Sequence, residues 1–177
     1  MMTDYIKAQK KGKRDYQIRL SHGERPTLPV LDEILPAKGE YKMVSLGIVQ
    51  IPIDRLVGTK TNARSNAFAG NFMPILDEKS EFAYKWQSLY NSQIEEGIRE
   101  PIKAYEYMNQ FYVEEGNKRV SVMKYVEMVS IPGTVTRIIP KKTNEKENKI
   151  YYEFLDFMMI QKSIIFGLLK RAVLQDL

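Results

Sequence analysis

The 177-residue sequence contains no cysteine and a single histidine, His22. The absence of thiols excludes disulfides, thiolate catalysis, cysteine-bound zinc and iron–sulfur clusters. One histidine cannot build a histidine-rich metal site, so we expect no metal site made by the chain alone. The groups left for catalysis are carboxylates, lysine, arginine, serine, threonine and tyrosine.

Long apolar runs are also missing. A membrane helix needs about 20 apolar residues, and the longest charge-free stretches, around residues 43–53 and 65–76, are shorter. A signal peptide needs an apolar core of about 7–15 residues, which Met1–Leu20 does not contain. We therefore expect a cytoplasmic protein with no membrane partner. The content of 44% hydrophobic and 28% charged residues is typical of one globular domain.

Most of the positive charge lies at the N-terminus. Residues 1–25 hold seven basic and three acidic residues, so they carry +4 of the formal net charge of +5. A helix is predicted over residues 3–20, and four of its basic residues share one face: Lys7, Lys10, Lys11 and Arg14. We interpret this face as solvated, with contact to nucleic acid or an anionic membrane as the alternative.

The rest of the sequence predicts an α+β fold, a mixed sheet over about residues 43–139 flanked by helices. Strands are expected at 43–51, 101–105, 110–113 and 134–139, and helices at 30–35, 80–95, 117–128 and 150–174. This organisation gives an N-terminal helical extension (1–40), a core domain (41–140) and a C-terminal helical extension (141–177).

Two further segments lead to specific expectations. Residues 58–74 are small and polar, which predicts a long surface loop. Within it, Phe68 and Phe72 either anchor the loop or stack on a base, and anchoring is the preferred interpretation. The last helix has a wide apolar face that either the core or a partner must cover.

The strongest chemical signal is a strand that runs through Gly116 directly into a helix. The helix begins with Asn117, Lys118 and Arg119. Free N–H groups and the helix dipole favour an anion at such a position, and glycine lets the backbone approach it closely. Basic residues in a first turn oppose the dipole by roughly 0.3–1 kcal/mol each, unless an anion joins them. The alternative is ordinary turn chemistry, with Lys118 and Arg119 paired to Glu114, Glu115 or Glu96.

The segment Glu115-Gly-Asn-Lys-Arg119 resembles the phosphate-binding element of the ParB/sulfiredoxin superfamily. Two other elements occur in the order of that family. Ile94–Ile102 resembles its step of a glycine followed by Pro-Ile, and Arg64 falls where the family places an arginine after its first strand. The resemblance covers roughly residues 44–139 and implies a ParB/sulfiredoxin-like mixed sheet flanked by helices.

The resemblance implies a nucleotide- or phosphate-binding domain that takes a nucleoside triphosphate or diphosphate with Mg²⁺. The residues that would hold the phosphates are Gly116, Asn117, Lys118 and Arg119, joined by Arg64, Lys60 and Thr59 from a facing loop. Glu114 or Glu115 would hold Mg²⁺ or take a proton from a hydroxyl nucleophile. Since neighbouring residues on a strand point to opposite faces, at most one of these two glutamates should face the site.

The departures from the family pattern narrow the function. Sulfiredoxins have a cysteine where this chain has Asn117, so their reductase chemistry is excluded. The chain also lacks the arginine-rich motif and the helix-turn-helix domain of partition-type ParB proteins, so CTP hydrolysis by a DNA clamp is not expected. A phosphotransferase and a nucleotide hydrolase remain open. The alternative is a DNA-binding or nuclease-type ParB-like domain. A third interpretation is a non-catalytic ligand sensor that signals through the C-terminal helix to a second copy or another protein.

Overall fold

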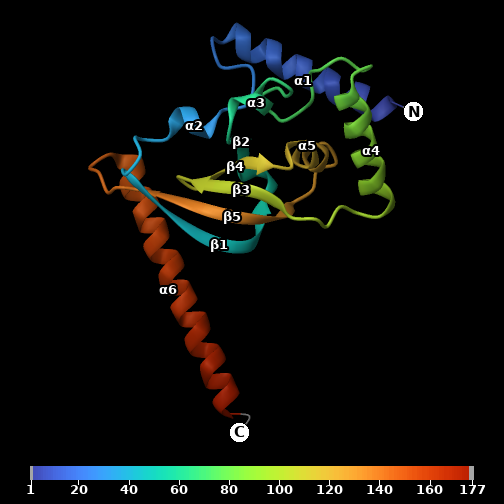
Figure 1. The fold of residues 1–177 in the computed structure, drawn as a ribbon. Helices are drawn as coiled ribbons and strands as arrows, with labels where there is room; N and C mark the ends of the chain where they lie inside the picture. Colours follow the sequence, from blue (N-terminus) through green and yellow to red (C-terminus); the bar gives the residue numbers. More distant parts are fainter. Residues whose placement is uncertain (1, 176–177) are drawn as a thin grey trace. The chain divides into compact units, whose positions relative to one another are not determined.

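The computed structural model describes residues 2–175, and the chain divides into two compact units, Met1–Ile139 and Pro140–Leu177. Elements α1 to β5 are α1 (Thr3–Ser21), α2 (Leu31–Ile34), β1 (Tyr41–Pro52), the short 3-10 helix η1 (Ile53–Arg55), β2 (Leu56–Thr59), α3 (Asn62–Ser65), α4 (Glu81–Glu95), β3 (Ile102–Tyr107), β4 (Gln110–Glu115), α5 (Asn117–Tyr125) and β5 (Ser130–Pro140) (Figure 1). The second unit contains α6 (Lys146–Gln175). The predicted α+β class is confirmed.

The five strands form one mixed sheet in the order β1-β5-β3-β4-β2. Strands β3 and β4 are antiparallel, because the turn at Met108 and Asn109 has both residues at positive φ, 52° and 65°. Strand β5 is parallel to β3, and β2 is parallel to β4. Strand β4 therefore lies inside the sheet, and α5 leaves directly from its end.

Helices α4 and α5 are fixed to each other by a buried aromatic contact. Trp86 on α4 is fully buried, and its indole N–H donates to the hydroxyl of Ser121 on α5 at 2.8 Å. The ring of Tyr5 on α1 packs edge-on against Trp86, with 5.6 Å between ring centroids. Burial of large aromatic side chains dominates core energetics, so this cluster holds the N-terminal turn of α5 in a fixed place.

The segment 58–74 is not the polar surface loop that its composition predicts. It contains the end of β2 and all of α3, and Phe68 and Phe72 are 1% and 0% exposed. Backbone bonds fold it tightly, with the Ala69 amide donating to the carbonyl of Met73 at 2.9 Å. The two phenylalanines supply the apolar anchors that the polar residues lack, so the anchoring interpretation is confirmed.

Helix α1 exposes a basic face to solvent and packs its apolar face against the rest of the first unit. Tyr5 and Ala8 are fully buried. The basic residues of the stripe are all exposed: Lys7, Lys10, Lys11 and Arg14. This exposure agrees with the preferred interpretation of a solvated face, and contact with nucleic acid or an anionic membrane stays the alternative.

Helix α6 has exposed apolar side chains along most of its length. Phe157, Ile160 and Phe166 are more than half exposed. Within residues 2–175, no helix is both long and apolar enough to cross a bilayer. The expectation that a partner covers this helix stays a prediction.

Helix α4 begins with a side-chain cap at Ser80, whose hydroxyl accepts a hydrogen bond from the Ala83 amide at 3.2 Å. We expect Ser80→Ala to lower the free energy of unfolding by about 1 kcal/mol, because an amide of the first turn loses its acceptor. The control is Ser88→Ala, an exposed position in the middle of the same helix, which should not destabilise the protein. Urea unfolding measures both, and equal losses would show that the hydroxyl does not act as a cap.

Candidate functional site

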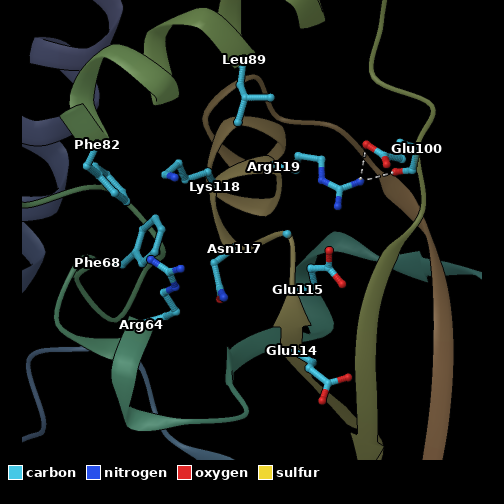
Figure 2. A pocket seen from close by; sticks show the side chains of 11 residues that line it. Arg64, Phe68, Phe82, Leu89, Glu100, Glu114, Glu115, Asn117, Lys118 and Arg119 are labelled. Carbon is cyan, nitrogen blue, oxygen red and sulfur yellow. Dashed lines mark hydrogen bonds and ion pairs between the residues drawn. The ribbon is translucent and has the colours of Figure 1, made fainter.

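A cavity of about 280 Å³ lies where β4 ends and α5 begins. Its lining comes from α3 and the segment after it, α4, the segment before β3, and the junction of β4 with α5 (Figure 2). The lining residues are Arg64, Phe68, Phe82, Leu89, Glu100, Glu114, Glu115, Gly116, Asn117, Lys118 and Arg119. The cavity thus brings together seven of the nine residues that the sequence predicts for the site.

Gly116 makes the turn from β4 into α5. Its φ of 108° lies in the left-handed region that side chains disfavour. A Cβ at this position would lie 2.6 Å from Cγ2 of Ile102. The backbone here therefore lies so close to β3 that only glycine fits without a clash. The first amide bonded within this turn is that of Val120, which donates to the Gly116 carbonyl at 3.0 Å. The N–H groups of residues 117–119 have no acceptor within the helix.

Two cations lie at this helix start without a direct ion pair, and the opposing charge that acts on Lys118 is the Glu81 carboxylate. Among residues 2–175, neither Lys118 nor Arg64 belongs to an ion pair. The Lys118 ammonium lies 5.2 Å from the centroid of the Phe82 ring, toward which it points in Figure 2. Burial, and then repulsion from Arg64 and Lys85, hold the pKa of Lys118 below its usual range. The pairing of Lys118 with Glu114, Glu115 or Glu96, the alternative to an anion site, is not formed.

Asn117 forms part of the cavity wall with an unsatisfied oxygen. The residue is 7% exposed, and within the described part of the chain its Oδ1 accepts no hydrogen bond. Figure 2 places its amide between Arg64 and Glu115. A buried acceptor without a donor costs about 1–3 kcal/mol, and such groups in native proteins call for an explanation.

Arg119 holds the neighbouring segment rather than facing the middle of the cavity. Its guanidinium donates to the carbonyls of Glu100 and Pro101 at 2.9 and 3.1 Å, and lies 3.4 Å from the Glu100 carboxylate. In Figure 2 the side chain turns toward Glu100, away from Lys118. Only 13% of it is exposed. The contacts fix the chain entering β3 against the first turn of α5.

This geometry predicts a structural effect of Arg119→Gln in the protein without ligand. We expect the free energy of unfolding to fall by about 1–3 kcal/mol, because two carbonyls lose a charged donor. Arg99→Gln is the matched control, since Arg99 lies just before the same segment and is exposed. Chemical unfolding compares the two. An Arg119→Gln protein as stable as the wild type would mean that the arginine does not hold the segment.

Glu114 and Glu115 both line the cavity, which corrects the expectation that at most one would do so. A β-bulge is the reason, since Lys103 pairs with Glu115 and Ala104 pairs with Val113, which leaves Glu114 as the extra residue. The strict alternation of side chains therefore ends before the site. Glu115 lies 2.8 Å from the Lys103 ammonium, which lowers the pKa of this exposed carboxyl group.

Thr59 and Lys60 do not line the cavity. Thr59 is 1% exposed, and its hydroxyl donates to the carbonyl of Val113 at 3.1 Å. The Lys60 ammonium lies 3.1 Å from the Asp32 carboxylate. Thr59 pairs with Val113 in the parallel ladder between β2 and β4. The Lys60 amide extends this ladder by donating to the Val113 carbonyl at 2.8 Å.

Four cavity residues were not predicted as site residues: Phe68, Phe82, Leu89 and Glu100. The preferred interpretation of Phe68 was that it anchors its segment. Phe82 and Leu89 stand at helical spacing on α4, which indicates only a core-facing stripe, and Glu100 has no motif around it. The spacing of 82 and 89 carries no chemical information. Phe82 and Leu89 line the same cavity as Lys118 because α4 packs on α5.

A metal site made by the protein alone is not found in the described residues. Within residues 2–175, no three histidine, aspartate or glutamate side chains lie in an arrangement that could hold a metal ion. Mg²⁺ commonly binds through substrate phosphates and one or two carboxylates. Glu114 and Glu115 fit that smaller role, in which most ligands come from the bound phosphates and water.

Comparison with known proteins gives a distant likeness among solved structures. No model of a protein family matches the chain, and no curated protein matches it. Among solved structures, a sulfiredoxin from Arabidopsis thaliana is similar, with a TM-score of 0.35 and 17% sequence identity, over 50% of this chain and 82% of that protein.

Proposed function

We propose that the cavity binds the phosphates of a nucleoside diphosphate or triphosphate at the N-terminus of α5. The observation that carries the proposal is the pair of cations, Lys118 and Arg64, which have no ionic partner in the described chain and lie at a helix start. Burial first, and then repulsion from Arg64, hold the pKa of Lys118 below its usual range, and a bound anion would counter both effects.

The electrostatics of the helix start favour phosphate over a neutral ligand. The three N–H groups that follow Gly116 and the positive end of the dipole favour negative charge there. A phosphate oxygen near these amides would accept charge-assisted hydrogen bonds, which are about twice as strong as neutral ones. The left-handed Gly116 keeps a side chain out of the approach to these amides.

The walls of the cavity support a ligand larger than phosphate alone. Phe82 and Leu89 form an apolar side, and the glutamates at the end of β4 form an acidic side. A volume of about 280 Å³ is just below the usual range for ligand pockets of about 300–1,000 Å³. The phosphates and part of the nucleoside fit inside, with the remainder in solvent.

Phosphoryl transfer and nucleotide hydrolysis are the activities that suit this arrangement. Glu114 and Glu115 are the two residues directly before Gly116 and line the cavity, and one of them would take the proton of an attacking hydroxyl or water. Lys118 and Arg64 would stabilise the charge on the transferred group. The chain's residues thus supply positioning and electrostatics, and bound Mg²⁺ would supply further charge neutralisation.

Isothermal titration of the full chain with nucleoside di- and triphosphates, with and without Mg²⁺, tests the proposal. We expect saturable binding that Lys118→Gln weakens at least tenfold. Lys79→Gln, an exposed lysine outside the cavity, should bind as the wild type does. An absence of binding, or equal binding by both variants, would refute the proposal. Titration of an oligonucleotide at increasing salt examines the nucleic-acid alternative, because contacts with the backbone weaken steeply with salt.

A further inference from the structure

We propose that helix α6 joins two copies of this chain in an antiparallel two-stranded coiled coil. The occupant of its exposed apolar face is the same helix of a second copy, related by a two-fold axis near Ser163. This inference concerns self-association and is independent of the proposed ligand, so a failure of nucleotide binding would leave it standing.

One row of residues on α6 has the spacing of a coiled-coil seam. Its positions are separated by alternating steps of three and four residues, which keeps them on one side of a helix. All of these positions except Lys162 are apolar. The row consists of Tyr152, Leu155, Met159, Lys162, Phe166, Leu169 and Val173. In a coiled coil, such side chains pack between those of the facing helix.

Most of this row is exposed to solvent. Phe166, Leu169 and Val173 are 68, 60 and 64% exposed. Tyr152 at the other end is half-buried, and its hydroxyl donates to the carbonyl of Pro140 at 2.5 Å. The chain's own residues therefore cover only the start of the row. Exposed apolar patches of this kind are typical of protein contact surfaces.

The lysine in the seam determines the orientation of the second copy. In a parallel pair, Lys162 would face Lys162 of the second copy, and two like charges would meet in an apolar contact. An antiparallel pair centred near Ser163 instead places Lys162 opposite Phe166 of the second copy. The ammonium group is attracted to the face of an aromatic ring, and the aliphatic stem packs along apolar surface.

The charges beside the seam favour a second copy in the same register. Asp156 and Lys170 lie on the same edge of the row, and each is seven positions from Ser163. Both are exposed, and neither belongs to an ion pair among residues 2–175. An antiparallel copy places Asp156 beside Lys170 of the second copy, and the two-fold axis forms this contact twice. A lipid surface requires no such symmetry of opposite charges about one position.

The other side of α6 is a poorer seam and supplies a control. A row with the same spacing runs through Phe157, Ile164 and Leu168, but it is interrupted by Gln161 and Arg171. Ile164 is 57% exposed, so it resembles the seam residues in exposure. It lies outside the proposed contact, and a charge there should not disturb the dimer.

Sedimentation equilibrium of the full chain is the first test, and we expect the mass of a dimer. Phe166→Glu should raise the dissociation constant roughly tenfold or more, because an unpaired charge would enter the seam. Ile164→Glu should associate as the wild type does. The fluorescence of Trp86, the buried single tryptophan of the chain, checks that the first unit is folded in both variants. Equal dissociation constants in the two variants would refute the proposed seam.

A charge exchange tests the orientation without placing a charge in the seam. Asp156→Lys should weaken the dimer by roughly three- to tenfold, because two attractive contacts become repulsive. Adding Lys170→Asp to the same chain restores the opposite charges in an antiparallel pair, so the affinity should return toward that of the wild type. A double variant that associates no better than Asp156→Lys would contradict the antiparallel register.

Cross-linking gives an independent readout, because the chain contains no cysteine. Ser163→Cys lies beside its own counterpart at the two-fold axis and should be joined to a dimer by a short bismaleimide. Val173→Cys should not be joined, because its two copies are separated by roughly 27 Å along the helices at a rise of about 1.5 Å per residue. A dimer joined through Val173→Cys but not through Ser163→Cys would show a parallel pair.

The remaining outcomes assign the face to another occupant and overturn the inference. A chain that stays monomeric at its highest soluble concentration would do so. If that monomer sedimented with vesicles of anionic phospholipid, the face would be a membrane contact. If it did not, the occupant would be a different protein.

Discussion

Gly116→Ala is expected to lower the free energy of unfolding by about 2–5 kcal/mol. Two effects add in this position. A left-handed backbone costs a residue with a side chain roughly 1–2 kcal/mol, and φ is 108° here. The new Cβ would also lie 2.6 Å from Cγ2 and 3.1 Å from Cβ of Ile102, which is fully buried. Crowding of a packed core typically costs about 1–3 kcal/mol.

Gly97→Ala separates the two effects. Gly97 also has a positive φ, 78°, but no atom lies within 4 Å of the Cβ it would gain. We expect this variant to lose only the backbone contribution of about 1–2 kcal/mol. Urea unfolding gives both values. Equal losses at the two glycines would show that Ile102 moves aside without cost, and crowding would then not contribute at Gly116.

A double mutant measures the packing contribution directly. Ile102→Ala removes the Cγ2 atom that the new side chain would meet. In that background, Gly116→Ala should cost less than in the wild type, and the difference is the coupling between the two positions. Additive losses would mean that the cost at Gly116 comes from the backbone alone.

The conformation at Gly116 was predictable because its cause is local. A strand, a glycine and a helix with polar residues in its first turn follow each other within a few residues, and the change of period is visible in the sequence. The bounds of α4 were predictable for the same reason, since Ser80 and the apolar spacing mark that helix.

The partners of the site residues were not predictable, because they are distant in sequence. Arg119 binds carbonyls 18 and 19 positions earlier, and nothing in the motif distinguishes that role from a ligand contact. The bulge at Glu114 depends on the register between β3 and β4. In segment 58–74, composition favoured a loop, but contacts of Phe68 with Phe82, at 5.3 Å between ring centroids, overrode it.

Replacement of both unpaired cations, Arg64→Gln with Lys118→Gln, should weaken nucleotide binding at least a hundredfold. Hydrogen bonds to charged groups contribute about 1.5–3 kcal/mol each, which is roughly ten- to hundredfold per residue. The double variant should fold normally without ligand, because neither Arg64 nor Lys118 forms an ion pair in the described chain. Calorimetry with circular dichroism as a folding control measures both. Unchanged affinity in a folded double variant would contradict the assignment.

The pH dependence of binding tests whether the positive charge of Lys118, rather than the shape of its side chain, contributes to affinity. The pKa of free Lys118 lies below its ordinary value of 10.5, first because of burial and then because of Arg64 and Lys85. A bound phosphate favours the charged ammonium and so raises this pKa in the complex. Binding therefore takes up a proton between the two pKa values, and affinity falls as pH rises through that window. Lys118→Arg keeps its charge throughout the alkaline range, so its affinity should stay level where that of the wild type falls. An identical pH profile in both proteins would mean that another group loses its proton there.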